Sequence, residues 1–132
     1  MKPIVLAICL MALVGCIHRD PLGVGYLIVD NQTNEQISVS YKLVYYDADT
    51  VTVCVLPQTK DTIYSEVGIG GCFTLGQLKV FEIATCDNPT HVLYKQEPIN
   101  ELEWIVDEQS TKGGFCYYSS NTFVVTDTLL NQ

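Results

Sequence analysis

The sequence lacks an apolar stretch long enough to cross a membrane as a helix, and it is poor in basic side chains. Its longest uninterrupted apolar run, residues 4–14, has 11 residues, whereas a transmembrane helix needs about 20. Only 7 Lys and Arg oppose 15 Asp and Glu, which gives a net charge of -8. Binding to the phosphates of nucleic acids is therefore not expected. A length of 132 residues allows one domain.

Histidine is scarce as well, which limits the chemistry available to the chain. Of its two histidines, His18 precedes the expected domain, so His91 is the only one placed to serve as the general base of a serine or cysteine nucleophile. No nucleophile elbow surrounds it, and we expect it on a strand, facing water. The cysteines lack the two- to four-residue spacing of a structural zinc site. We therefore expect no metal, no cofactor and no catalytic residues.

The N-terminus has the form of an export signal. A positive start, the apolar run and a small residue before Cys16 match a secretory signal peptide. Leu13-Val14-Gly15-Cys16 further resembles the lipobox of bacterial lipoproteins. The resemblance implies that the Cys16 thiol carries diacylglycerol and that the signal is removed just before it, so that the membrane is a partner. An ordinary secretory signal is the alternative. We expect a signal peptide at 1–15, a lipidated tether at 16–23 and a single domain at 24–132.

Alternation of apolar and polar residues dominates the rest of the chain. In residues 36–46, Ile37, Val39, Tyr41, Leu43 and Tyr45 fall on one face of a strand. A turn of helix followed by a strand is expected around Ile99 to Val106, where Asn100 and Glu103 are placed for a capping box. The strand-like runs are 26–29, 36–46, 50–55, 62–67, 78–84, 91–94, 104–106, 115–118 and 122–126. Short strands at this spacing predict an all-β fold, an antiparallel β-sandwich that is immunoglobulin-like or similar, with about 7–9 strands.

Four cysteines of the expected domain predict two disulfides. Cys54, Cys72, Cys86 and Cys116 are even in number and belong to an exported chain. Cys72 and Cys86 are the least favourable pair, because the strand between them separates its two ends by roughly 23 Å, whereas disulfide Cα atoms lie within about 7 Å. The other pairings stay open.

Two further groups of side chains suggest contact with a ligand. Glu101, Glu103, Asp107 and Glu108 surround Trp104, as in the paired carboxylates and aromatic platform of a glycoside hydrolase; a solvated acidic rim is the simpler interpretation. The doublets Tyr45-Tyr46 and Tyr117-Tyr118 each place one ring on either face of a strand. Outward rings such as Tyr46 suit a protein or glycan surface, although cross-strand ring pairs are the favoured interpretation.

The lipobox together with most of the mature chain resembles the small lipoproteins without an agreed activity that are common in the Bacteroides phylum. The resemblance rests on the lipobox, on the strand that runs into an asparagine and threonine turn at 26–33, on Trp104 and on the ending 122–127. It implies a bacterial outer-membrane protein but no activity. Acidic residues soon after the lipidated cysteine favour surface export in this phylum; here Arg19 precedes a single Asp20, which favours the periplasmic face.

Proteins exported by these bacteria carry O-glycans at Asp-(Ser/Thr)-(apolar or Thr). The chain has three such triplets, with acceptors Thr50, Thr62 and Thr128. Turns that contain aspartate before a β-branched strand generate the same triplets without modification.

Together these features predict a non-enzymatic binding or assembly module anchored in the cell envelope by lipid on Cys16, with a protein or glycan partner. The alternatives are a small carbohydrate-active hydrolase that uses the acidic cluster near Trp104, and a lipid-anchored pilus or fibre subunit that exchanges strands with its neighbours.

Overall fold

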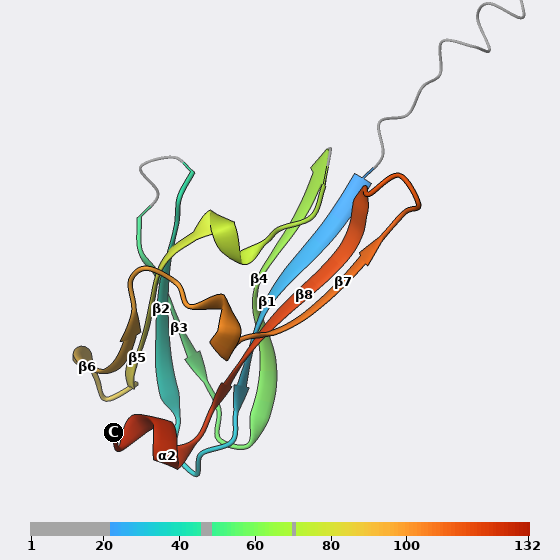
Figure 1. Ribbon diagram of the computed structural model, residues 1–132. Helices are drawn as coiled ribbons and strands as arrows, with labels where there is room; N and C mark the ends of the chain where they lie inside the picture. Colours follow the sequence, from blue (N-terminus) through green and yellow to red (C-terminus); the bar gives the residue numbers. More distant parts are fainter. Residues whose placement is uncertain (1–21, 46–48, 70) are drawn as a thin grey trace, which may run out of the picture.

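The computed structural model describes residues 22–45, 49–69 and 71–132, which form a sandwich of two four-stranded sheets (Figure 1). Sheet A has the strand order β4-β1-β8-β7, and sheet B has the order β3-β2-β5-β6. The predicted all-β sandwich is confirmed. Its elements are β1 (Leu22–Asn31), β2 (Ile37–Leu43), β3 (Val51–Val55), β4 (Thr59–Ile69), the 3-10 turn η1 (Leu75–Gln77), β5 (Leu78–Thr85), β6 (Asn88–Gln96), the 3-10 turn η2 (Glu101–Glu103), β7 (Ile105–Ser110), β8 (Cys116–Val125) and the short helix α2 (Asp127–Leu130).

One strand pair departs from the expected antiparallel arrangement. β1 and β8, the first and last strands, lie side by side and run parallel, with Val24 opposite Tyr118 and Asn31 opposite Val125. The other strand pairs are antiparallel. Alternation of apolar and polar residues identifies a strand but not the direction of the neighbouring strand, so it could not predict this parallel pair. The N-terminal strand consequently occupies the middle of sheet A.

The core lies between the inner faces of the sheets, and β1 shows how the sequence fills it. Its residues alternate between buried and partly exposed, with Leu27 and Val29 fully buried. The rings of Phe81, Trp104 and Phe123 meet at centroid distances of 4.9 Å. The predicted turn of helix and the strand that follows it are present as the 3-10 turn η2 and as β7. Trp104 therefore joins the two sheets through the aromatic core.

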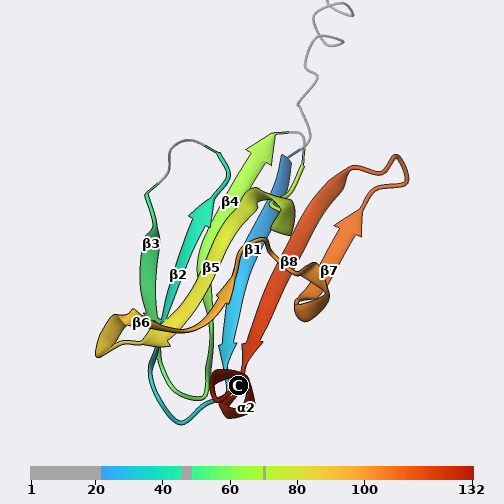
Figure 2. The same ribbon diagram turned by 60° about the vertical axis from the view of Figure 1, so that its left-hand side comes forward.

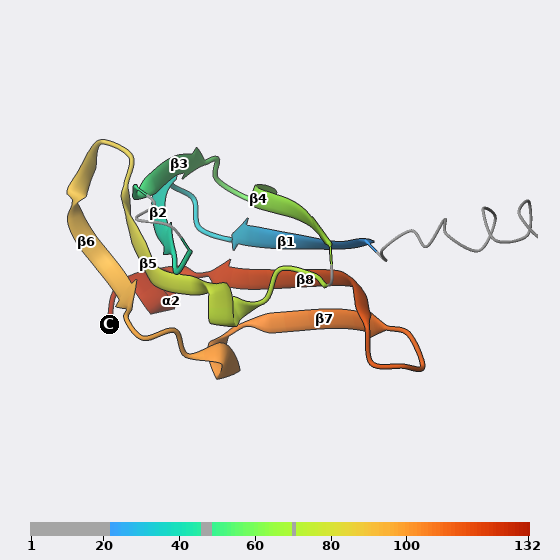
Figure 3. The ribbon, with the colours of Figure 1, turned by 90° about the horizontal axis from the view of Figure 1, so that it is seen from above.

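Between the sheets, the chain crosses from β4 to β5 directly over the start of β1. Phe73 in this crossing segment, residues 71–77, is buried. A side chain on Gly25 would place its Cβ 2.4 Å from the Cβ of Phe73, and one on Gly23 would lie 2.4 Å from the Gly71 carbonyl oxygen. Residues 23 and 25 are glycines because the crossing segment leaves no room for a side chain. In Figures 2 and 3 the start of β1 and the β7–β8 loop lie at the same end of the sandwich, and α2 lies at the opposite end.

Three predicted boundaries are wrong. The runs 115–118 and 122–126 belong to the single strand β8, because the inward polar residues between them are bonded: Ser119 donates to the Phe73 carbonyl, and Asn121 donates to the Tyr26 carbonyl at 3.2 Å. β1 begins at Leu22, four residues before the predicted strand run 26–29. β2 ends at Leu43, so Tyr45 is 55% exposed instead of facing the core.

The asparagine and threonine turn after β1 is a buried hydrogen-bond network. Asn31 is fully buried, and its amide donates to the Glu35, Val55 and Leu56 carbonyls at 2.9–3.2 Å. Its amide oxygen accepts from the backbone and hydroxyl of Thr33 at 3.1 and 2.7 Å. Since Val55 ends β3, this one side chain connects sheet A to sheet B.

Two disulfides brace the sandwich, in one of the pairings that the sequence left open. Cys54 bonds to Cys86 and Cys72 bonds to Cys116, with Cα–Cα distances of 6.1 and 5.6 Å. Cys54 lies in β3 and Cys86 directly after β5, whereas Cys116 begins β8 and Cys72 lies in the crossing segment after β4. The continuous strand β5 separates Cys72 from Cys86, as expected.

Candidate functional site

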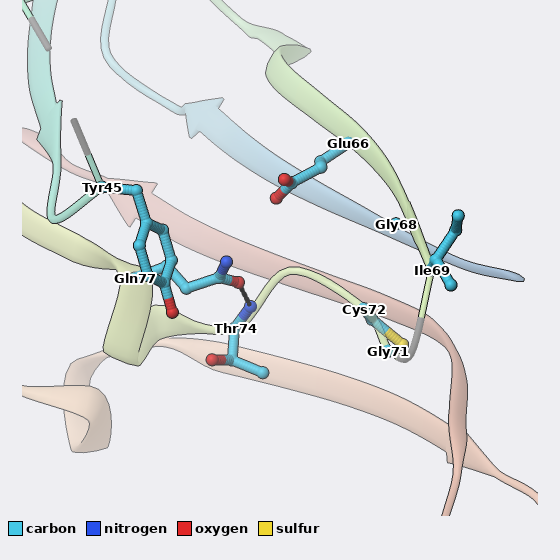
Figure 4. Close-up of a pocket in the computed structure, with 8 residues that line it drawn as sticks. All are labelled: Tyr45, Glu66, Gly68, Ile69, Gly71, Cys72, Thr74 and Gln77. Atoms are coloured by element: carbon cyan, nitrogen blue, oxygen red, sulfur yellow. Dashed lines mark hydrogen bonds between the residues drawn. The ribbon is translucent and has the colours of Figure 1, made fainter.

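An open cleft of about 380 Å³ lies at the end of the sandwich where β1 begins, since Ile69 in its lining is paired with Leu22. Three segments form it: the residues just after β2, the last part of β4 and the crossing segment. Figure 4 shows the Glu66 carboxylate reaching from β4 into the gap, with Tyr45 and Gln77 on the opposite side. Its lining residues are Tyr45, Glu66, Gly68, Ile69, Gly71, Cys72, Thr74 and Gln77.

Local hydrogen bonds fix the wall of the cleft that η1 provides. The Thr74 backbone N–H donates to the Gln77 side-chain oxygen at 2.8 Å, so the last residue of η1 caps the residue that precedes the turn. The Val44 N–H donates to the Gln77 carbonyl at 2.8 Å. Cys72 is held to β8 by its disulfide. Tyr45 and Gln77 are thus positioned on a braced frame.

An aromatic contact joins β4 to the crossing segment, the two segments that carry most of the cleft lining. Tyr64 packs edge-on against Phe73 at 5.2 Å and lies 6.0 Å from Tyr41. Burial, and then the nearby Glu66 carboxylate, raise the pKa of Tyr64. Burial also raises the pKa of Tyr41, whose hydroxyl donates to the Ile63 carbonyl at 3.2 Å. Among the lining residues, Glu66 is the one that carries a carboxyl group.

The cleft can bind, but its lining offers no recognisable reaction machinery. A carboxylate, a phenol and an amide can hydrogen-bond a polar ligand, and the Tyr45 ring adds an apolar face. None of its described lining residues is a histidine, and its cysteine is in a disulfide. The sequence did not single out Glu66 or Gln77, because nothing local shows that β4 and η1 face each other across a gap.

The structure disperses the acidic cluster expected around Trp104. Trp104 is buried against Phe81 and Phe123, so it offers no exposed platform for a sugar. Glu101 and Glu108 line a small hollow of about 90 Å³ beside η1. Asp107 pairs with Ser120, and the next residue, Glu108, pairs with Ser119. Because successive side chains of a strand point to opposite faces of the sheet, Asp107 points away from the face that carries Glu108.

Glu103 is occupied by a network that joins η2 to β6. Its carboxylate accepts from the Tyr94 hydroxyl, from Asn100 at 2.9 Å and from Gln96 at 2.9 Å. These bonds, that from Tyr94 foremost, hold the pKa of Glu103 below its ordinary value. The Gln96 oxygen in turn accepts from the Trp104 indole at 2.9 Å. The general acid of a glycosidase needs a raised pKa, whereas the pKa of Glu103 is lowered.

Other predicted residues are scattered over the sandwich. His91 lies exposed on β6, as expected. Thr50, Thr62 and Thr128 are all exposed, just before β3, in β4 and in the first turn of α2. Cys16, Arg19, Asp20 and Tyr46 lie outside the described residues.

The second tyrosine doublet follows the favoured interpretation. Tyr118 on β8 lies 5.9 Å from Tyr26 on the neighbouring strand β1, which is a cross-strand ring pair. Tyr117 is 45% exposed. The first doublet differs, because Tyr45 lies past the end of its strand and contributes to the cleft instead.

No protein-family model matches the chain, and neither a curated protein nor a solved structure is similar to it. Within residues 22–45, 49–69 and 71–132, no three His, Cys, Asp or Glu side chains are grouped as a metal site would require. Over the same residues, no helix has the length and apolar character needed to span a bilayer.

Proposed function

We propose that this protein is a lipid-anchored module of the bacterial cell envelope that binds or assembles with a partner and catalyses no reaction. The observation that carries the proposal is the spacing of two features: the lipobox cysteine, Cys16, stands six residues before Leu22, where the disulfide-braced sandwich begins. Two disulfides suit an oxidising compartment. The order of positive start, apolar run, lipobox and braced domain supports an outer-membrane lipoprotein of the kind common in the Bacteroides phylum, on the periplasmic face.

In this proposal the cleft is where the partner is bound. It combines an exposed aromatic ring, a single carboxylate and an amide on a frame fixed by a disulfide. Such a surface suits a protein segment or a glycan, both of which present hydrogen-bonding groups beside apolar faces.

Photo-crosslinking tests the binding role. A photoreactive phenylalanine analogue replaces Tyr45, which is 55% exposed, in one variant and Val92, an exposed control on β6 at 41%, in another. Irradiation of intact cells should give one discrete cross-linked species from position 45 and none from position 92, and Glu66→Gln should reduce its yield. If the two positions give the same background pattern, the cleft is not a binding site.

The non-enzymatic part of the proposal is supported by the state of the acidic side chains. Glu103 is held ionised by its donors, and Trp104 is buried. We expect no turnover of cell-wall or other glycans; activity abolished by Glu101→Gln or Glu103→Gln would establish the hydrolase instead. Strand exchange in a fibre is also not needed, because β1 already fills the place between β4 and β8.

The three threonine acceptors are proposed glycosylation sites, supported by their exposure. Each lies at a point of the surface that a transferase can approach. The intact mass of the natively produced protein decides: polypeptide plus lipid alone would remove the proposal.

A further inference from the structure

The outer face of sheet A carries an apolar patch at the end where β1 begins. In register, Leu22 lies opposite Ile69, and Val24 lies between Val67 and Tyr118. Leu22, Val67 and Ile69 are 60%, 68% and 74% exposed, which is unusual for aliphatic side chains grouped on neighbouring strands. We call this set the β1-end patch; its members are Leu22, Val24, Tyr26, Val67, Ile69 and Tyr118.

Polarity changes along the same face with distance from this end. At the far end of β1 and β4, Asp30 lies opposite Lys60. Within the patch, the residues opposite Tyr26 are Ser65 and Ser120, and none of these positions is charged. The chain has a net charge of -8, so an uncharged corner of this kind is a distinct surface, suited to a partner that is itself apolar or interfacial.

The length of the tether between Cys16 and Leu22 determines which apolar surface of the sandwich lies nearest to the membrane. Six residue steps separate Cys16 from Leu22, and an extended chain covers at most about 3.6 Å per residue, or roughly 20 Å in all. Acyl chains on Cys16 would hold that residue at the bilayer surface. Leu22 would therefore stay within roughly 20 Å of the bilayer surface, so the patch around it can reach the membrane.

We propose that the β1-end patch rests on the bilayer to which Cys16 is anchored. Leu22, Val67 and Ile69 enter the interface between headgroups and acyl chains, and the rings of Tyr26 and Tyr118 lie at headgroup level, where tyrosine is favoured. The uncharged patch avoids the repulsion that the acidic remainder of the chain would meet at an anionic surface. This inference rests on the proposed lipid anchor. It gives the sandwich a fixed orientation instead of free rotation on its tether.

The experiment places the mature chain, Cys16–Gln132, on a nanodisc of phosphatidylethanolamine with a minor share of phosphatidylglycerol. Because the four other cysteines are in disulfides, a maleimide lipid couples at Cys16 whether or not the native protein is lipidated. A gadolinium-chelating lipid then broadens the NMR signals of methyl groups close to the surface. Val44 provides the decisive comparison, since it is 53% exposed at the same end but just after β2. Leu56, 59% exposed beyond β3, reports on the far end.

We expect the methyls of Val67 and Ile69 to broaden severalfold more than those of Val44 and Leu56. The double substitution Val67→Ser and Ile69→Ser should reduce the broadening of Val24 to the level of Val44, whereas Leu56→Ser should leave it unchanged. Equal broadening of Val67, Ile69 and Val44 would overturn the inference, because a sandwich that tumbles on its tether gives that result.

Self-association through the patch and absence of the native lipid anchor are each distinguished by a separate measurement. If the patch methyls shift with protein concentration in lipid-free solution, with Cys16 capped, a second copy of the chain covers the patch and the inference fails. The native anchor is measured independently, as the mass of the N-terminal peptide of the cell-derived protein. An unlipidated Cys16 would defeat the proposed function without altering the nanodisc result, and a lipidated Cys16 with equal broadening would defeat only the patch.

Discussion

Removal of the Cys72–Cys116 disulfide is the sharpest test of how this fold is stabilised. The bridge joins the crossing segment to the start of β8. It lies where the chain is packed most closely: a Cβ on Gly23 would lie 2.4 Å from the Gly71 carbonyl oxygen and 2.7 Å from that of Cys116. The perturbation is the double substitution Cys72→Ser and Cys116→Ser, which removes the crosslink and leaves two small polar side chains.

The loop that the bridge closes sets the magnitude. A separation of 44 residues corresponds to about 4 kcal/mol of unfolding free energy in the chain-entropy treatment, and the 32-residue separation of Cys54–Cys86 to about 3.7 kcal/mol. Small domains have urea m-values of about 1–3 kcal/mol/M, so the midpoint should fall by roughly 1.3–4 M.

Urea unfolding followed by far-UV circular dichroism provides the measurement, with Cys54→Ser and Cys86→Ser as the matched variant. Hydrogen exchange locates the effect: amides at the starts of β1 and β8 should exchange faster without Cys72–Cys116, and amides of β2 and β3 without Cys54–Cys86. A thiol titration of the unfolded, unreduced protein should find all four cysteines oxidised. A loss below about 1 kcal/mol for both pairs, or four free thiols, would refute the reasoning.

Three further predictions follow from the core and its hydrogen bonds. Gly25→Ala should cost about 1–3 kcal/mol or more in unfolding free energy, because its Cβ would lie 2.4 Å from the Cβ of Phe73. Gly76→Ala is the control, since the nearest atom to its Cβ would be 3.7 Å away. Equal stability of the two variants in urea would contradict the account. Asn31→Ala should cost about 2–4 kcal/mol, since it removes a buried amide that donates to three carbonyls and accepts from Thr33, whereas Gln32→Ala at an exposed neighbouring position should be nearly neutral in the same assay. The pKa of Glu103 is lowered, so its stabilising effect is present above its unfolded pKa of about 4.3 and is lost as the pH falls through the lower folded pKa. The difference in unfolding free energy between wild type and Glu103→Gln should therefore shrink below about pH 4. A difference that does not change with pH would show that the carboxylate is not responsible.

Alternation was sufficient to predict β2 because one of its faces is covered by the opposite sheet. Ile37, Val39 and Tyr41 of β2 are buried as the period-two pattern requires. The pattern failed where polar residues turn inward and find partners. Ser119 and Asn121 read as a gap between two strands, yet the carbonyls of Phe73 and Tyr26 satisfy them inside one continuous strand.

Long-range contacts were the part that the sequence could not supply. The parallel pairing of β1 with β8 and the path of residues 71–77 across Gly25 depend on segments that are distant along the chain. The candidate cleft depends on the same crossing, which brings Gln77 opposite Glu66. The acidic cluster shows the converse: Glu103, Asp107 and Glu108 are neighbours in sequence, but η2 and the alternation of β7 direct them to different surroundings.

The central claim, that Cys16 anchors this sandwich in a membrane, is tested most directly by mass spectrometry of the N-terminal peptide from protein isolated from the membrane fraction of the producing cell. The account predicts a peptide that begins at Cys16 and carries the mass of a diacylglyceryl group on its thiol. A peptide that retains residues before Cys16, or that begins there with an unmodified thiol, would contradict it.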